Sequence, residues 1–182
     1  MLEYLLIHAE EKIRQIEEGA EPEFLEVITD RIKAATILAG LAQSVHKEAL
    51  FLLPNDKALM RMDKLRVLDS LIMASTRGAS VKIICPTTDH NSEITKRISE
   101  EAPELNIRSW RVGLPYGLFI ADNSKYFNAE LRDPDAQNFS EAIGFGLYSN
   151  SRAGVDSFKS FFELLWNKPL AESPHAEPPC RR

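Results

Sequence analysis

The sequence predicts an α/β fold built on a mixed, mostly parallel sheet flanked by helices, with an N-terminal helical extension. Two short apolar runs, 49–53 and 80–85, are each followed by a proline, and a helical stripe of apolar residues at 59–72 lies between them. This succession is typical of a βαβ unit, whose parallel strands are buried on both faces. The runs 117–122 and 126–132 flank an Asp-Asn-Ser-Lys turn that favours an antiparallel hairpin. The predicted sheet is therefore mixed.

Residues 2–18 form the predicted helical extension, because apolar side chains recur there with heptad spacing. The apolar positions are Leu2, Leu6, Ala9, Ile13 and Ile16. This spacing is typical of a coiled-coil seam, through which two copies of the chain would form a homodimer. A helix that folds back onto its own domain explains the same spacing. The sequence leaves both interpretations open.

Further elements are predicted from periodicity and from proline and glycine positions. A long helix is expected at 23–47, because small and apolar residues line one face of it. The segment 132–140 is expected to be a polar loop. The other predicted helices cover 92–101 and 151–166, and the other predicted strands cover 107–112 and 142–148.

A chain of 182 residues is long enough for one domain of ordinary size plus an appended helix. We therefore expect a signalling helix at 1–20, one domain at 23–167 and a disordered tail at 168–182. The tail is rich in proline and polar residues and cannot bury enough apolar surface to fold.

Composition argues against several classes of partner. With 22 Lys and Arg against 27 Asp and Glu, the net charge of −5 gives no overall attraction to phosphate backbones, so nucleic acid is not expected. The longest apolar runs are far shorter than the ~20 residues that span a bilayer, and no signal peptide opens the chain. We expect a cytoplasmic domain without a membrane partner. Cys85 and Cys180 lack metal-ligand spacing, so no metal or cofactor is predicted.

Polar residues follow several predicted strands, and ligands collect at the carboxyl ends of parallel strands. Asn55, Thr87, His90, Ser149 and Asn150 are candidate ligand-binding residues on this ground. The same residue types cap helices, and capping explains their positions without any ligand. His90 has no second histidine or cysteine at metal-ligand spacing, so a zinc site is not supported.

The strand predicted at 126–132 alternates between two kinds of side chain. One face carries Asn128, Glu130 and Arg132, while the other is apolar. These three residues are candidates for a polar recess that binds a ligand, and Asp122 is a further ligand-binding candidate. A solvated face of an outer strand explains the alternation as well.

The stretch 117–166 resembles the closing half of a phospholipase D-like repeat, whose active members carry His-x-Lys, four residues and Asp. Aligned on Asp122, the lysine position holds Gly117 and the histidine position holds Pro115. Neither residue supplies a nucleophile or a cation for phosphate. The Gly-Ser-x-Asn signature is replaced by the residues 129–132. The resemblance therefore implies a single phospholipase D-like half that is not an enzyme.

The residues Tyr126–Asp133, Phe139–Gly144, Tyr148–Ser151 and Phe161–Trp166 are similar to the phospholipase D-like sensor region of archaeal signal-transducing histidine kinases. The effector domains of archaeal sugar-sensing transcriptional regulators are similar at a greater distance. The resemblance implies a sensory module that binds a small ligand or a partner and signals through its terminal helices. The chain has no phosphoacceptor motif and no Gly-rich nucleotide box, so a kinase or regulator domain would lie elsewhere in a full-length protein.

Two other functions stay open. One is a phosphodiesterase or nuclease whose site is rebuilt from Asp122, Glu130 and His90. The other is the effector domain of a transcriptional regulator, with its DNA-binding module outside this chain.

Overall fold

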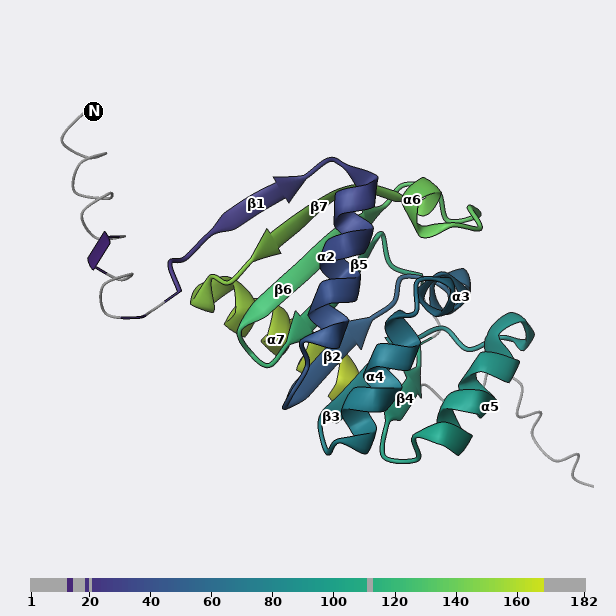
Figure 1. Cartoon of the computed structure of the whole chain (residues 1–182). Helices are drawn as coiled ribbons and strands as arrows, with labels where there is room; N and C mark the ends of the chain where they lie inside the picture. The colour runs from purple at the N-terminus through teal and green to yellow at the C-terminus, as the bar shows by residue number, and fades with distance from the viewer. Residues whose placement is uncertain (1–12, 15–18, 20, 111–112, 169–182) are drawn as a thin grey trace, which may run out of the picture.

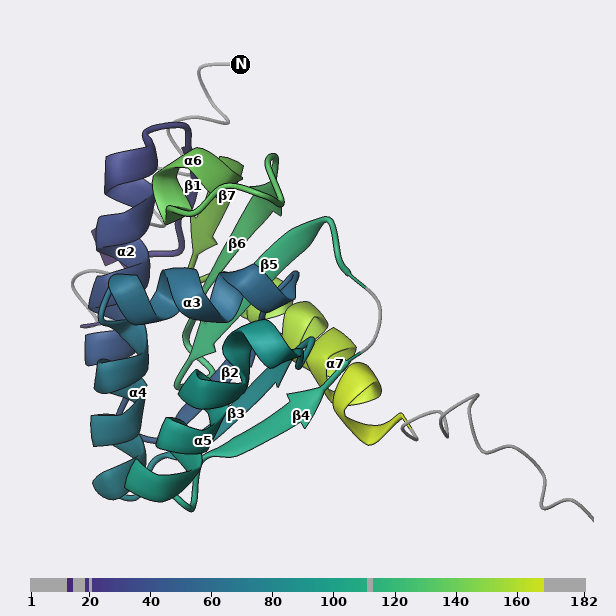
Figure 2. The ribbon, with the colours of Figure 1, turned by 90° about the vertical axis from the view of Figure 1, so that its right-hand side faces the viewer.

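A seven-stranded sheet forms the centre of the domain in the computed structural model, and helices cover both of its faces (Figures 1 and 2). The structure describes residues 13–14, 19, 21–110 and 113–168. The predicted heptad seam at 2–18 therefore lies outside the described residues for most of its length, and so does the tail beyond Lys168.

The sheet is mixed, as predicted, but most neighbouring strands are antiparallel, whereas the prediction was of a mostly parallel sheet. Its strands are β1 (Leu25–Ile28), β2 (Glu48–Leu52), β3 (Ser80–Cys85), β4 (Asn106–Ser109), β5 (Tyr116–Ala121), β6 (Lys125–Leu131) and β7 (Ile143–Ser149), in the spatial order β1-β7-β6-β5-β2-β3-β4. The β2–β3 and β3–β4 pairs are parallel, and the other four pairs are antiparallel. Following these pairings across the sheet, β1, β2, β3, β4 and β6 share one direction, and β5 and β7 run against it.

The helices are divided unequally between the two faces (Figure 2). They are α2 (Arg31–Gln43), α3 (Asp56–Lys64), α4 (Val67–Thr76), the 3₁₀ turn η1 (Asp89–Asn91), α5 (Ser92–Glu101), α6 (Phe139–Ala142) and α7 (Arg152–Asn167). Apolar side chains from α2 to α6 pack into a large core on one face of the sheet. On the other face, α7 is the one helix of the described residues that packs against β2, β5 and β6, over a smaller core.

The long helix predicted at 23–47 is wrong at its N-terminal end, because this segment begins with strand β1. Asp30 separates strand from helix: its backbone is extended, and its carboxylate accepts the backbone N–H groups of Ile32 (2.8 Å) and Lys33 (3.1 Å). These bonds satisfy N–H groups that the first turn of α2 leaves free. The apolar periodicity runs through both elements, which hides the boundary from a periodicity argument.

The helical stripe at 59–72 also divides in two. Arg66 has a left-handed backbone (φ 61°), which ends α3 and starts α4 in a new direction. The backbone N–H of Arg66 donates to Asp63 O at 2.9 Å and closes the turn. The predicted polar loop at 132–140 contains the start of the short helix α6. The other predicted elements that fall on described residues agree with the structure to within a few residues at their ends.

The last helix packs onto the sheet through its aromatic side. Phe162 is fully buried, and Phe158 packs on Tyr126 with ring centroids 4.7 Å apart. Gly154 lets the helix approach closely, because a Cβ there would lie 2.7 Å from the Tyr126 ring. Burial of these rings fixes α7 against β5 and β6.

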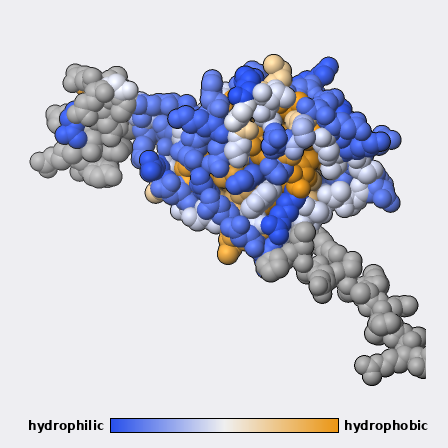
Figure 3. Space-filling view, turned by 90° about the horizontal axis from the view of Figure 1, so that it is seen from below, coloured by the Kyte–Doolittle hydropathy of each residue, from blue (hydrophilic) through white to orange (hydrophobic). Residues whose placement is uncertain are grey.

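On the face seen from below, apolar residues gather in one area bordered by hydrophilic ones (Figure 3).

Within the described part of the chain, no helix is long and apolar enough to cross a membrane.

Candidate functional site

The candidate site lies at the edge of the sheet where β1, β2, β3 and β6 end and β5 begins. Asn55 follows β2, and Thr87 and His90 follow β3. Glu130 lies near the end of β6, and Arg132 follows that strand. The structure therefore brings five of the predicted site residues to one edge. Three other predicted residues lie at the opposite edge.

Asp122 is one of the misplaced candidates, because it follows the far end of β5. Its carboxylate accepts the backbone N–H groups of Lys47 (2.7 Å), Glu48 (2.9 Å) and His46 (3.0 Å). Burial acts to raise the pKa of this carboxyl, but the three backbone donors outweigh it and the pKa is lowered. Asp122 thus anchors the β5–β6 turn to the start of β2, and its oxygens are already used.

Ser149 and Asn150 also lie at the opposite edge, since β7 runs against β2 and ends where β2 begins. The Ser149 hydroxyl donates to Phe24 O at 2.5 Å. The Asn150 amide oxygen accepts Phe24 N–H at 2.8 Å, and its nitrogen donates to Pro22 O at 3.0 Å. Both residues hold the segment that leads into β1. The prediction placed Ser149 and Asn150 at the wrong edge because β7 runs against β2 and β3, so its carboxyl end lies at the opposite edge of the sheet.

The loop after β3 is organised by capping. The Thr88 hydroxyl donates to Asp56 Oδ2 at 3.0 Å and accepts the backbone N–H of His90 at 3.3 Å. Asn91 is fully buried and donates to Pro86 O (2.8 Å) and Asp56 O (3.2 Å). His90 and Thr87 have exposed side chains. Among the described residues, no group of three His, Cys, Asp or Glu side chains is placed to hold a metal ion.

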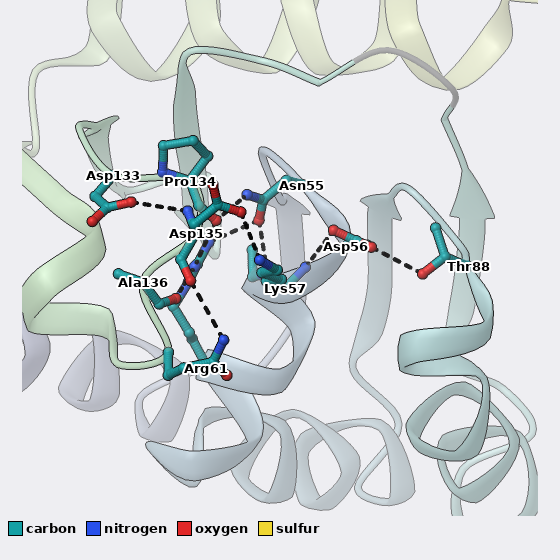
Figure 4. Close-up of polar contacts among 11 residues, drawn as sticks. Asn55, Asp56, Lys57, Arg61, Thr88, Asp133, Pro134, Asp135 and Ala136 are labelled. Atoms are coloured by element: carbon teal, nitrogen blue, oxygen red, sulfur yellow. Dashed lines mark hydrogen bonds and ion pairs between the residues drawn. The ribbon is translucent and has the colours of Figure 1, made fainter.

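Arg61 is the central residue of this edge, and the sequence argument missed it. Its side chain is buried to 2% exposure and donates to Ala136 O (2.7 Å), Asn55 Oδ1 (2.7 Å) and Pro134 O (3.4 Å) (Figure 4). Asn55 also donates to Pro134 O at 3.0 Å and caps α3 by accepting Ala58 N–H at 2.9 Å. Helix α3 and the loop after β6 are thus joined by a shared network.

We call the loop residues 133–137 the strap. Lys57 forms an ion pair with Asp135 at 2.6 Å, and Lys64 donates to Gln137 O at 3.0 Å. Burial lowers the pKa of Arg61, against the nearby charges of Asp56 and Asp133. About 73 residues separate α3 from the strap along the chain, as the Arg61–Pro134 bond shows. No local sequence pattern predicts a contact between α3 and the strap.

The two positions that the phospholipase D-like resemblance aligns with catalytic groups, Pro115 and Gly117, lie beside β2. Pro115 precedes β5, and its carbonyl accepts Leu131 N–H at 2.7 Å. A Cβ at Gly117 would lie 3.4 Å from Pro54 Cδ and 3.5 Å from Leu52 O. The nearby cavity, lined mostly by core side chains, has a volume of about 40 Å³. Ligand pockets usually measure roughly 300–1,000 Å³, so this cavity accommodates water-sized groups only.

A larger polar recess of about 370 Å³ lies at the ends of β1 and β6. It is lined by Thr29, Arg31, Glu130, Arg132, Gly144 and Phe145. Glu130 lies over Gly144, where a Cβ would come within 2.1 Å of its Oε2. Among the described residues, no carboxylate lies within ion-pair distance of the guanidinium group of Arg31 or of Arg132.

The predicted polar recess around Glu130 and Arg132 is therefore present, and Thr29 and Arg31 complete it. The sequence argument missed both because it ran one helix from 23 to 47, which hid the end of β1 and the start of α2 at Arg31. Asn128 lies outside this lining, and its amide donates to Gly117 O at 3.3 Å.

No family model matches the chain, and no curated protein sequence matches it. Several solved structures share its fold. NucT from Helicobacter pylori superposes with a TM-score of 0.59 at 15% identity, covering 79% of this chain and 94% of NucT. Nuc from Salmonella typhimurium, a phospholipase D family member, gives 0.57 at 14% identity, covering 80% of this chain and 95% of Nuc.

TrmBL2, an archaeal chromatin protein whose structure shows a novel mode of DNA binding, superposes with a TM-score of 0.58 at 20% identity. The match covers 92% of this chain and 62% of the TrmBL2 chain. The net charge led us not to expect nucleic acid as a partner. This finding corrects that expectation, because the same fold occurs in a protein that binds DNA. A total charge does not describe local surfaces. The comparisons agree on one point: the chain has the fold of phospholipase D-like proteins.

Proposed function

We propose that this chain is a non-catalytic regulatory domain that binds a small polar ligand in the recess at the ends of β1 and β6. One observation carries the proposal. The edge keeps an open polar recess with Arg31, Arg132 and Glu130, whereas the nucleophile and cation positions hold Pro115 and Gly117.

The rival reading, a phosphodiesterase or nuclease with a rebuilt site, requires Asp122, Glu130 and His90 to act together. Glu130 pairs with Tyr116 at the start of β5, while Asp122 follows the end of that strand. Six strand residues at ~3.3 Å each separate these two carboxylates by roughly 20 Å. A single phosphoryl group cannot contact both. The carboxylate of Asp122 is in addition held by three backbone donors.

The recess favours a ligand that carries an anionic group and a hydrogen-bond donor. The two guanidinium groups have free donors for a carboxylate or phosphate oxygen, and Glu130 accepts from an ammonium or hydroxyl group. The volume of about 370 Å³ lies within the usual range for a small metabolite.

Ligand binding has a short route to the last helix. Tyr116 is the strand partner of Glu130, and its ring lies against Phe161 of α7 with centroids 6.2 Å apart. A shift of Glu130 towards a ligand would move β6 against β5 and, through Tyr116, change the packing of α7. This supports the idea that α7 passes the bound state to an attached domain.

Two settings fit such a domain. The first setting is the sensor region of an archaeal-type histidine kinase, which the resemblance of the sequence motifs implies. The effector domain of a DNA-associated regulator is favoured by the TrmBL2 match, which extends over most of this chain and about three fifths of that one. The second setting has the structural comparison on its side, and we favour it.

Thermal unfolding in the presence of small probes tests the proposal. We expect a free amino acid, a small dicarboxylate, inorganic phosphate or a sugar phosphate to stabilise the domain, by about 2.7 kcal/mol at a hundredfold excess over Kd. Arg132→Gln should abolish the shift. Arg66→Gln removes the same charge from an exposed ion pair with Asp69 and should leave the shift unchanged. An equal shift in Arg132→Gln would place binding outside the recess.

A further inference from the structure

Both tryptophans of the chain, Trp110 and Trp166, lie on one surface with three cationic side chains. We call this the tryptophan–cation surface, and its residues are Lys82, Arg108, Trp110, Trp166 and Lys168. It lies on the α7 side of the sheet, at the β3–β4 edge, away from the recess.

Strand alternation brings these residues together. On β3, Val81, Ile83 and Cys85 enter the large core on the opposite face, so Lys82 and Ile84 point towards α7. Arg108 is the β4 partner of Ile84 and shares its face. Trp110, two residues further on, packs against the same smaller core. Because α7 covers β2, β5 and β6, these positions on β3 and β4 are only partly covered.

The end of α7 completes the surface beside β4 (Figure 2). The Trp166 ring is stacked on Phe162, with centroids 5.8 Å apart and planes at 15°. Lys82 Nζ lies 5.7 Å and Arg108 Cζ 6.0 Å from the Trp166 ring centroid. Arg108 also donates to Lys168 O at 2.6 Å, and Lys168 Nζ lies 5.6 Å from the Trp110 ring. Cations and indole rings thus alternate along a single surface.

The three cations carry uncompensated charge. Elsewhere Lys33, Lys57, Lys125 and Lys159 each form an ion pair with a carboxylate. Within the described residues, no carboxylate lies within ion-pair distance of Lys82, Arg108 or Lys168. Although the net charge of the chain is −5, this area of its described surface is locally positive and aromatic.

We propose that the tryptophan–cation surface binds single-stranded nucleic acid, an activity separate from the proposed ligand recess. Phosphates of the strand displace the cations from the indole faces, and bases stack on the freed rings of Trp110 and Trp166. Basic side chains that follow the backbone, combined with aromatic platforms for bases, are the usual means of binding single strands. A partner recognised by charge alone, such as an acidic polypeptide, would not stack on the two indole rings.

The intrinsic tryptophan fluorescence reports on this surface alone, because the chain has no other tryptophan. We expect an oligothymidylate of about 20 nucleotides to quench the emission saturably at low salt, since base stacking on indole rings needs only a few nucleotides. Three phosphate contacts predict a log–log salt slope of about −2 for the binding constant. Lys82→Glu with Lys168→Glu should weaken binding at least about tenfold. Lys96→Glu reverses an exposed charge on α5 and should change it less than about twofold.

Three outcomes would overturn the proposal. One is the absence of saturable quenching at low salt. Another is equal quenching by poly-glutamate of matched charge or by a duplex of the same length, which would show that charge alone is recognised. The third is equal affinity in the double variant and in Lys96→Glu. Circular dichroism of each variant confirms that the fold is intact, so a loss of quenching is assigned to the surface. Failure here leaves the recess proposal untouched, because Arg132 lies outside this surface.

Discussion

The carboxylate of Asp122 accepts the backbone N–H of Lys47 at 2.7 Å, which joins the turn between β5 and β6 to the first residues of β2. Asp122 and Asn123 have left-handed backbones (φ 51° and 53°), so the turn itself is tight. Asp122, the one residue that matches the phospholipase D-like catalytic motif in the sequence resemblance, therefore has an architectural role in this structure.

Asp122→Asn should lower the free energy of unfolding by about 1–3 kcal/mol, because an amide presents N–H groups to backbone donors that need an acceptor. Urea unfolding at neutral pH measures the change. Asp156→Asn removes a carboxylate from an exposed pair with Arg152 and should cost no more than about 0.5 kcal/mol. Equal losses in the two variants would contradict the architectural role.

The contribution of Asp122 should also depend on pH. Its pKa is lowered in the folded state, so the unfolded chain binds its proton first as pH falls. The stabilisation is complete above the ordinary carboxyl pKa and is lost as pH falls through the lowered folded pKa. Unfolding curves of the wild type and of Asp122→Asn should therefore converge in acid. A difference that widens towards low pH would have the wrong sign.

Arg61→Lys should destabilise the domain by on the order of 2 kcal/mol, although it keeps the charge. A single ammonium group cannot reach Asn55 Oδ1 and the carbonyls of Pro134 and Ala136 at once, and the position is buried. Faster proteolytic cleavage within the strap provides a second readout. Lys64→Ala removes an exposed contact to the same strap and should have a small effect on both measurements. An Arg61→Lys protein as stable as the wild type would show that the strap is held by other contacts.

Phe162→Ala should cost about 3–5 kcal/mol, because the side chain is fully buried between α7 and the sheet. The Leu164 side chain, two residues away, is 67% exposed. Leu164→Ala should therefore change the free energy of unfolding by less than about 0.5 kcal/mol. Guanidinium unfolding of both variants gives the comparison. A loss below about 1 kcal/mol for Phe162→Ala would mean that α7 does not form part of the core.

Much of the fold follows from local pattern. The apolar runs gave β2 and β3, and the Asp-Asn-Ser-Lys turn gave the hairpin, because each rests on neighbouring residues. Strand β1 and the break at Arg66 were missed for the opposite reason. Helical periodicity continues through both, and only the capping by Asp30 and the left-handed backbone of Arg66 interrupt it.

Part of the polar recess was predicted. Strand alternation, a local signal, indicated Glu130 and Arg132, which line the recess, and also Asn128, which does not. Ser149, Asn150 and Asp122 were misassigned because strand direction decides which edge a residue occupies, and β5 and β7 run against the others. Arg61 and the strap came together only through tertiary contacts.

We propose that this domain, which has the fold of phospholipase D-like proteins, has no phosphodiesterase activity, and hydrolysis of bis(p-nitrophenyl) phosphate is the test. Pro115 and Gly117 supply neither nucleophile nor cation, so the rate with Mg²⁺, Mn²⁺ or a chelator should equal that of buffer. Glu130→Gln and His90→Ala remove the candidate groups at the carboxyl edge without disturbing the Asp122 anchor. Turnover above background that either substitution abolishes would contradict the account.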